Sequence, residues 1–255
     1  MKINLITKIS LAALFTAIAI ILTRFLSIID IPAIPFLRVS LAPSFVVFSG
    51  MILGPLYGGI VGLLSDVIGF FLFNRGAFAY NYLFSIAPIL NGVIAGLLMY
   101  IYPRIKTKLN RIPFIQILSF VALNIGITLF FHFNSEFILF GKQYALNFSS
   151  RMLIICLSYL LTVLYFSIYS YCFFYKFKGN NDKLVYLNTT SLCILFSLVA
   201  TQICLNVPIK VFYFQIDPLV ILGTQLLSTL IEIGFGTFLI IPLYDIAVKK
   251  LNKRI

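Results

Sequence analysis

The sequence predicts an all-α fold, a polytopic membrane bundle of about eight spanning helices. Hydrophobic residues make up 61% of the 255 residues, and charged residues make up only 10%. The mean hydropathy is +1.07. A soluble domain carries about 25% charged residues, and a water-soluble fold has no place to bury this much apolar side chain. The lipid bilayer is therefore the expected solvent of this chain.

Apolar stretches of about 20 residues, the length that crosses a bilayer, follow one another along the chain. The expected spans are 8–29, 41–56, 57–73, 81–102, 113–133, 150–175, 185–206 and 218–247. The second and third spans are short, and Gly54 and Pro55 separate them. They form either a tight hairpin or one kinked, partly re-entrant unit. The first span is too long for a cleaved signal peptide and is expected to stay as a membrane helix.

Basic residues are distributed unevenly between the two sides of the predicted bundle. With the N-terminus inside, 13 of the 19 lysines and arginines fall in inner segments. The other six lie on or near the outer side: Arg24, Arg38, Arg75, Lys142, Arg151 and Lys210. Cytoplasmic loops carry an excess of Lys and Arg, so both termini are predicted to be cytoplasmic and the number of spans even. The same rule explains the net charge of +12 without a nucleic-acid partner.

The chain lacks the sequence patterns of metal sites and of common enzymes. It has one histidine, and its four cysteines are scattered through apolar stretches without CxxC spacing. Phosphate-loop, HExxH and GxSxG motifs do not occur. We therefore expect no metal, no cofactor and no ATP hydrolysis by this chain, and an enzyme is disfavoured.

Residues 1–255 are predicted to form a single membrane domain, because the longest polar connection, 176–183, is too short to fold alone. The sequence of residues 117–122 is similar to that of residues 194–200. This weak similarity leaves open an internal duplication, in which 113–175 and 192–247 are two versions of one helical hairpin.

Asp66 lies inside the third predicted span and Glu232 lies near the middle of the eighth. A charge at the centre of a lipid-facing helix costs about 2.5–3.5 kcal/mol. Each is therefore expected to face the bundle interior, a water-filled cavity or an interface. For Asp66, a structural pair with a nearby base or hydroxyl and a functional role are both open. For Glu232 we expect a role that faces a ligand or a partner.

Two predicted outer loops combine basic and aromatic side chains. Residues 30–40 contain Arg38 and two stiffening prolines, and residues 73–82 contain Arg75, Phe78, Tyr80 and Tyr82. Together they suit a planar, anionic small molecule, because aromatic rings stack on its ring and a guanidinium pairs with its carboxylate. The alternative is an interfacial aromatic belt with arginines on lipid headgroups.

Residues 38–100 carry the most specific pattern in the chain. The run from Gly50 to Asp66 follows GxxLGPxYGxxVGxxxD. This run resembles the substrate-binding S components of energy-coupling factor (ECF) vitamin transporters, and its continuation to Asn91 is most similar to their folate-specific branch. Ala13 and Ala17 match the AxxxA face by which such proteins dock on a transmembrane coupling subunit. Residues 192–247 are loosely similar to their last two helices.

The resemblance implies a mechanism and a smaller fold. Such a protein binds a vitamin at its outward face, docks on the coupling subunit, tips within the membrane and releases the vitamin inward, while two separate ATPase subunits drive the cycle. The family usually has six helices, so 113–175 is expected to be an inserted or duplicated hairpin beside a six-helix core.

The resemblance and the loops together predict a substrate site for folate or a related vitamin. Its expected residues are Arg38, Arg75, Phe78, Tyr80, Tyr82, Asn91 and Glu232. Asn91 stands where the folate branch usually has an arginine, so another planar ligand, such as another vitamin or a queuosine precursor, stays open. A different hypothesis is a lipid-modifying membrane enzyme with Asp66 and Glu232 as its acids or bases, facing each other. A third is a structural protein without a ligand.

Overall fold

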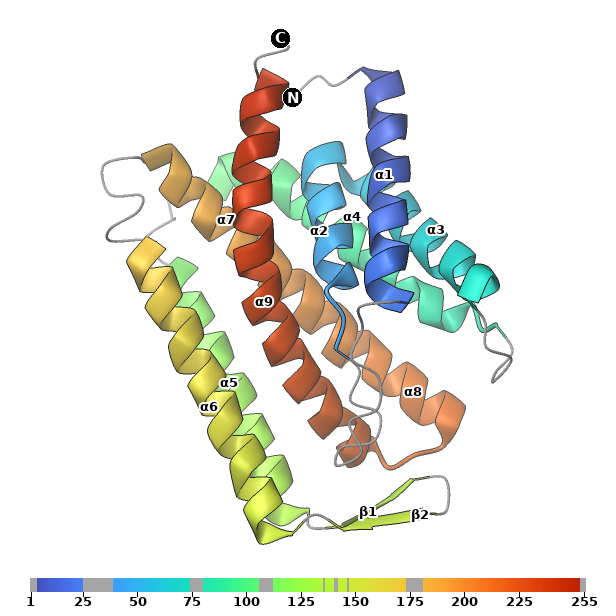
Figure 1. Ribbon diagram of the computed structural model, residues 1–255, viewed down its shortest axis with the longest axis vertical. Helices are drawn as coiled ribbons and strands as arrows, with labels where there is room; N and C mark the ends of the chain where they lie inside the picture. The colour runs from blue at the N-terminus through green and yellow to red at the C-terminus, as the bar shows by residue number, and fades with distance from the viewer. Residues whose placement is uncertain are drawn as a thin grey trace.

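The computed structural model describes residues 4–24, 39–73, 80–105, 112–134, 136–139, 142–145, 147–172 and 181–252. Figure 1 shows a bundle of helices, and α1 begins at the same end of the bundle where α9 finishes. The elements in chain order are α1 (Leu5–Arg24), α2 (Ala42–Leu53), α3 (Pro55–Phe73), α4 (Leu83–Ile105), α5 (Ile112–Phe133), β1 (Glu136–Leu139), β2 (Lys142–Ala145), α6 (Phe148–Tyr171), α7 (Asn181–Leu198), the π-helix η3 (Val199–Asn206), α8 (Val207–Phe214) and α9 (Pro218–Asn252).

The predicted membrane helix bundle is confirmed. Within the described residues, seven helical segments are long and apolar enough to cross a membrane, and α2 is a shorter apolar helix. One of the seven, Leu187–Phe214, runs continuously through α7, η3 and α8, so it extends well beyond the predicted end at residue 206. The sequence did not predict the antiparallel hairpin of β1 and β2, which pairs Glu136 with Ala145 and joins α5 to α6.

The short helix α2 settles how the second and third predicted spans are built. Its 12 residues extend about 18 Å, which is less than the roughly 30 Å of a bilayer core. Gly54 separates it from α3 and has φ of +93°, a conformation that L side chains rarely adopt. The two predicted spans are therefore separate helices that meet at a tight turn, and α2 begins beside the middle of α9 (Figure 1).

Glycines bring α2, α3 and α4 into backbone contact. A Cβ atom added at Gly92 would lie 2.1 Å from the carbonyl oxygen of Gly58, and one added at Gly50 would lie 2.1 Å from that of Gly92. At Gly62 the same construction meets the Pro88 carbonyl oxygen at 2.1 Å. These four glycines thus pack helices within this chain, as close-approach faces do in other membrane bundles.

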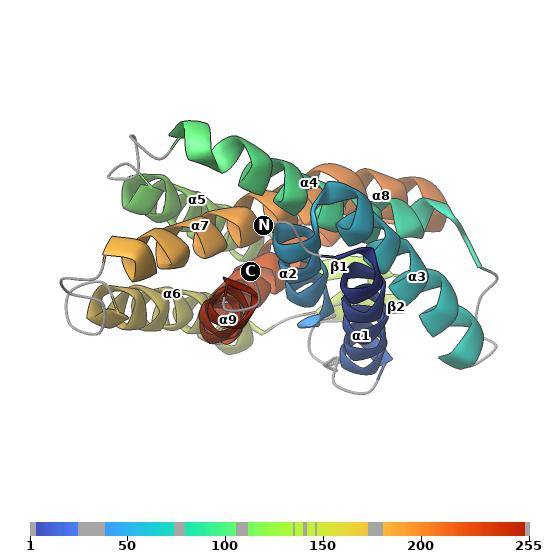
Figure 2. The same cartoon turned by 90° about the horizontal axis from the view of Figure 1, so that it is seen from above.

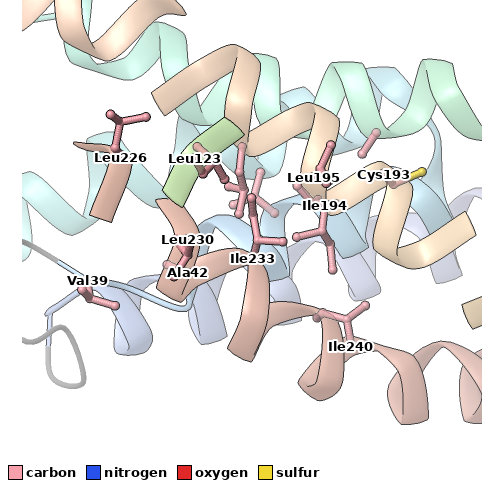
Figure 3. Close-up of a cluster of buried hydrophobic side chains, with 14 of the residues drawn as sticks. Val39, Ala42, Leu123, Cys193, Ile194, Leu195, Leu226, Leu230, Ile233 and Ile240 are labelled. Carbon is pink, nitrogen blue, oxygen red and sulfur yellow. The ribbon is translucent and has the colours of Figure 1, made fainter. Parts of the chain in front are cut away.

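The rest of the bundle packs around α9. This helix contacts α2, α5, α6 and α7, and Figure 2 shows α5 and α6 on the side of the bundle away from α1 and α3. The hydrophobic cluster in Figure 3 joins Ile194 of α7 to Leu230 and Ile233 of α9, with Ala42 of α2 in the same cluster. These side chains fix the distance between α2, α7 and α9.

Polar contacts hold the α5–α6 pair against α7. The side-chain amide of Gln116 donates to the Ser191 hydroxyl, and the Tyr169 hydroxyl donates to the Asn188 side chain. The ring of Tyr165 stacks on Phe120 with centroids 4.4 Å apart. Interhelical hydrogen bonds of this kind stabilise membrane bundles. The pair is therefore an integral part of the fold, while its origin by insertion or duplication stays a prediction.

We predict that Gly92→Ala destabilises the protein strongly, because the new methyl group overlaps the backbone of Gly58 and only a shift of α3 relieves the overlap. Overpacking of this kind costs about 1–3 kcal/mol or more. Thermal unfolding in detergent measures the effect. Gly234→Ala is the matched control, because a Cβ there meets no atom within 4 Å. Equal melting temperatures for the two variants would contradict the close approach of α3 and α4.

Candidate functional site

Glu232 is the central residue of a polar cluster in the interior of the bundle. Its side chain is 2% exposed. One carboxylate oxygen, Oε1, accepts a hydrogen bond of 3.0 Å from the backbone N–H of Ser40, and Oε2 accepts one of 3.0 Å from the side-chain amide of Gln202. A carboxylate removed from water needs such donors, because its desolvation is otherwise very costly. Glu232 thereby ties α9 to α2 and to η3.

The short length of α2 places its N-terminus against this carboxylate. Ser40 lies just before the helix, and its hydroxyl accepts from the backbone N–H of Ala42 at 3.2 Å. The unpaired N–H groups at a helix start carry a partial positive charge, which stabilises a nearby anion. A helix that begins inside a membrane bundle can thus hold a negative charge where lipid-facing residues could not.

The π-helix η3 supplies the amide side chains of the cluster. Asn206 donates from Nδ2 to Oε1 of Gln202 at 2.5 Å, so three side chains form a chain from Asn206 through Gln202 to Glu232. Thr201 directly precedes Gln202, and its hydroxyl donates to Oδ1 of Asn91 on α4 at 2.7 Å. Segments of π-helix are rare and occur frequently at functional sites. Here the wider turn presents Thr201 and Gln202 to two different helices.

Three buried hydroxyl groups lie close to this cluster in sequence and have no hydrogen-bond partner within the part of the chain that the structure describes. They are those of Ser44, Ser197 and Thr229, each 0% exposed. Ser44 lies on the first turn of α2 and is close to α9. A Cβ atom added at Gly236 of α9 would be 2.0 Å from the Oγ of Ser44. Unsatisfied buried hydroxyls are uncommon in proteins. They add buried polar groups to the three segments, α2, the end of α7 and α9, that meet at the cluster.

A second polar group lies between α3 and α4. The Ser85 hydroxyl donates to Oδ2 of Asp66 at 2.5 Å and also contacts the hydroxyl of Tyr80. Arg24, at the end of α1, packs over Gly69 and interacts electrostatically with Asp66. The Tyr80 ring packs against Phe70 with centroids 5.1 Å apart. Of the two readings of Asp66, this geometry fits a structural pairing with a base and a hydroxyl.

The structure brings some of the expected site residues together and separates others. Asn91 and Glu232 both join the first cluster, through Thr201 and Gln202. Tyr80 joins the second group, and Tyr82 is 73% exposed. Arg38, Arg75 and Phe78 lie outside the described residues. Asp66 and Glu232 have different partners, which does not fit an enzyme that uses them as a facing pair.

The sequence analysis missed Ser40, Thr201, Gln202 and Asn206. Uncharged polar residues are common in membrane helices, whereas the carboxylates of Asp66 and Glu232 carry a large free-energy cost that marks them as candidates. The signal was the density of polar residues between Ser197 and Asn206 within an otherwise apolar span. The irregular helix there gives these side chains directions that a regular α-helix would not.

The sequence of the chain matches a family of known proteins. The profile of ECF-type riboflavin transporter S components matches residues 3–166. The chain belongs to this family of transporter S components. Its members form a class of transport proteins, not a class of enzymes. The match extends through α5 and most of α6, so it includes much of the segment predicted to be an extra hairpin.

A curated relative gives a second comparison. The folate transporter FolT of Clostridium novyi (strain NT) is 38% identical over 88 residues, which are 34% of this S component and 48% of that protein. The match thus spans about half the length of the relative. No solved structure matches the chain. The two comparisons agree on vitamin transport and differ in the vitamin that they name.

We predict that Ser85→Ala lowers the stability of the S component, because it leaves a carboxylate oxygen of Asp66 without its donor. A hydrogen bond to a charged group contributes about 1.5–3 kcal/mol. Tyr80→Phe and the double variant complete a thermodynamic cycle, which thermal unfolding measures. We expect the two effects to be less than additive, because both substitutions break the same row of hydrogen bonds from Tyr80 through Ser85 to Asp66. Ser119→Ala is the control, since that exposed hydroxyl bonds only to its own helix. Full additivity would show that Tyr80 and Asp66 are independent.

Proposed function

We propose that this S component is the high-affinity substrate-binding subunit of an ECF-type importer for folate or a related vitamin. The observation that carries the proposal is the buried polar cluster around Glu232 in a member of a transporter family. Intramembrane ionisable residues are functional by default, because their cost must be offset. The same cluster supplies hydrogen-bonding groups that the polar ring of a vitamin requires.

Folate is the preferred ligand within this proposal. The similarity to a folate transporter supports it, as do the two arginines of the outer loops, which match a ligand that carries carboxylates. Arg38 and Arg75 would contact the anion, and Phe78, Tyr80 and Tyr82 would stack on the ring. Asn91 and Glu232 would belong to the polar part of the site that receives its polar edge. Riboflavin, which the family description names, and a queuosine precursor are the alternatives.

The first helix is the proposed docking surface for a transmembrane coupling subunit. Ala13 and Ala17 are exposed on one face of α1, while Ala12, Thr16 and Ala19 are buried against the bundle. An exposed strip of small side chains permits close approach of another helix. Two separate ATPase subunits would supply the energy. The helix α1 begins at the end of the bundle where α9 finishes, and the predicted inner segments are basic. Both features support a protein of the cell membrane whose two termini are cytoplasmic.

The direct test is binding of radiolabelled folate and riboflavin to the purified protein in detergent. We expect saturable folate binding at submicromolar concentration, and competition by excess unlabelled folate. Riboflavin binding with no folate binding would change the ligand and keep the transporter role. No binding of either vitamin at micromolar concentration would refute the ligand proposal and leave family membership intact.

We expect Ala13→Trp to abolish vitamin uptake by cells that express the full importer, while binding to the purified subunit is unchanged. The indole ring would hold the coupling-subunit helix away from α1. Leu160→Trp is the control, because Leu160 is 56% exposed on α6, far from the proposed docking face. Uptake by Ala13→Trp at the wild-type rate would show that α1 is not the docking surface.

A further inference from the structure

We propose that Glu232 determines which heterocycle the site accepts. It would do so by fixing the amide orientations of Gln202 and Asn206, so that the site offers hydrogen-bond acceptors to its ligand. Such a site selects a ring edge rich in N–H donors, as in an aminopyrimidinone, over one rich in carbonyl oxygens, as in a dioxopyrimidine. This inference rests on the proposed vitamin-binding function and names the chemical class of its ligand.

The first step is the orientation of Gln202. The backbone N–H of Ser40 can only donate, so Oε1 of Glu232 accepts from it. The other oxygen of an ionised carboxylate is also an acceptor, and it lies 3.0 Å from the Gln202 side chain. Gln202 must therefore turn its NH₂ group toward Glu232. Its carbonyl oxygen then points away from Glu232, along η3.

The second step carries this orientation to Asn206. The carbonyl oxygen of Gln202 lies 2.5 Å from the Asn206 side chain. Two carbonyl oxygens would repel at this distance, so Asn206 also turns its NH₂ group inward and presents Oδ1 at the far end of the chain. Gln202 and Asn206 are half-buried, whereas Glu232 is buried. One buried carboxylate thus sets the polarity of two amides that a ligand can reach more easily.

The third step is the match to a ligand edge. A pterin ring, the heterocycle of folate, carries a ring N–H and an exocyclic NH₂ group side by side. The dioxopyrimidine edge of riboflavin carries one N–H between two carbonyl oxygens. Acceptors that a bound ring shields from water and that meet its carbonyl oxygens stay unpaired, and each such unpaired group costs about 1–3 kcal/mol. Sites built to hydrogen-bond a donor strongly reject analogues that lack it.

The test compares two small probes of the same size that differ at C2 and the adjoining N1 of the pyrimidine ring. Pterin carries an NH₂ group where lumazine, its dioxo analogue, carries a carbonyl oxygen. We expect the purified wild-type protein to bind pterin at least about tenfold more tightly than lumazine. Glu232→Gln should reduce this ratio at least about tenfold, because the Ser40 N–H holds the oxygen of the new amide, so its NH₂ group faces Gln202 and reverses the orientation of that side chain. Isothermal titration or competition against labelled folate measures both affinities.

Two further variants separate ligand recognition from folding. Asp66→Asn changes the other intramembrane carboxylate, which belongs to a different network, and should leave the ratio unchanged. Asn206→Leu removes the terminal acceptor of the chain and keeps the contact between Glu232 and Gln202. Asn206→Leu should lower the ratio of pterin to lumazine affinity in the same way. This variant replaces Glu232→Gln in the test if Glu232→Gln does not yield folded protein.

Each outcome has one meaning. A lower ratio in Glu232→Gln or Asn206→Leu, with no change in Asp66→Asn, supports the inference. Equal weakening of both probes would show that Glu232 is structural only, and tighter wild-type binding of lumazine or riboflavin would reverse the proposed polarity. Both results overturn the inference and leave the vitamin-binding function in place. A wild-type protein that binds neither folate, riboflavin nor either probe would refute the function itself.

Discussion

A carboxylate buried in an apolar bundle needs hydrogen-bond donors, and Glu232 has donors from two described segments that are far away in sequence. Ser40 lies 192 residues before it and Gln202 lies 30 residues before it. Because an unsatisfied anion in a low-dielectric interior is very costly, the start of α2, the π-helix η3 and the middle of α9 are held together. The hydrophobic contacts of Ile194, Leu230 and Ile233 would allow these helices to slide, whereas the directional bonds to Glu232 fix their register.

The half-length helix α2 is possible only because of the glycines around it. The contacts of Gly50 with Gly92 and of Gly92 with Gly58 bring three backbones together at distances that any side chain would prevent. The turn at Gly54 then lets α2 stop before it has crossed a membrane and return as α3. A full-length helix in this position would place its N-terminus at the bundle surface. The N-terminus would then be unable to stabilise a charge at the level of Glu232.

The sequence determined the membrane class, the succession of apolar helices and the identity of the two costly carboxylates. Composition and stretch length suffice for these, because a bilayer imposes one strong constraint on every spanning segment. The pattern from Gly50 to Asp66 led to the same family that the profile match to residues 3–166 shows. Arg38, Arg75 and Phe78 remain sequence predictions outside the described residues, and Ala13 and Ala17 remain a predicted docking face that is exposed as such a face must be.

Only the tertiary structure decided what surrounds these residues. Apolar periodicity cannot reveal that residues 199–206 form a π-helix, nor that the amide of Gln202 reaches Glu232, because the pairing of two distant segments cannot be read from the periodicity of either one. The same limit separated Asp66, which bonds Ser85, from Glu232, which bonds Ser40 and Gln202. The sequence therefore determined that Asp66 and Glu232 need polar partners, through the cost of placing a carboxylate in a membrane helix. Their partners, and with them the polarity of the candidate site, depend on which helices pack together.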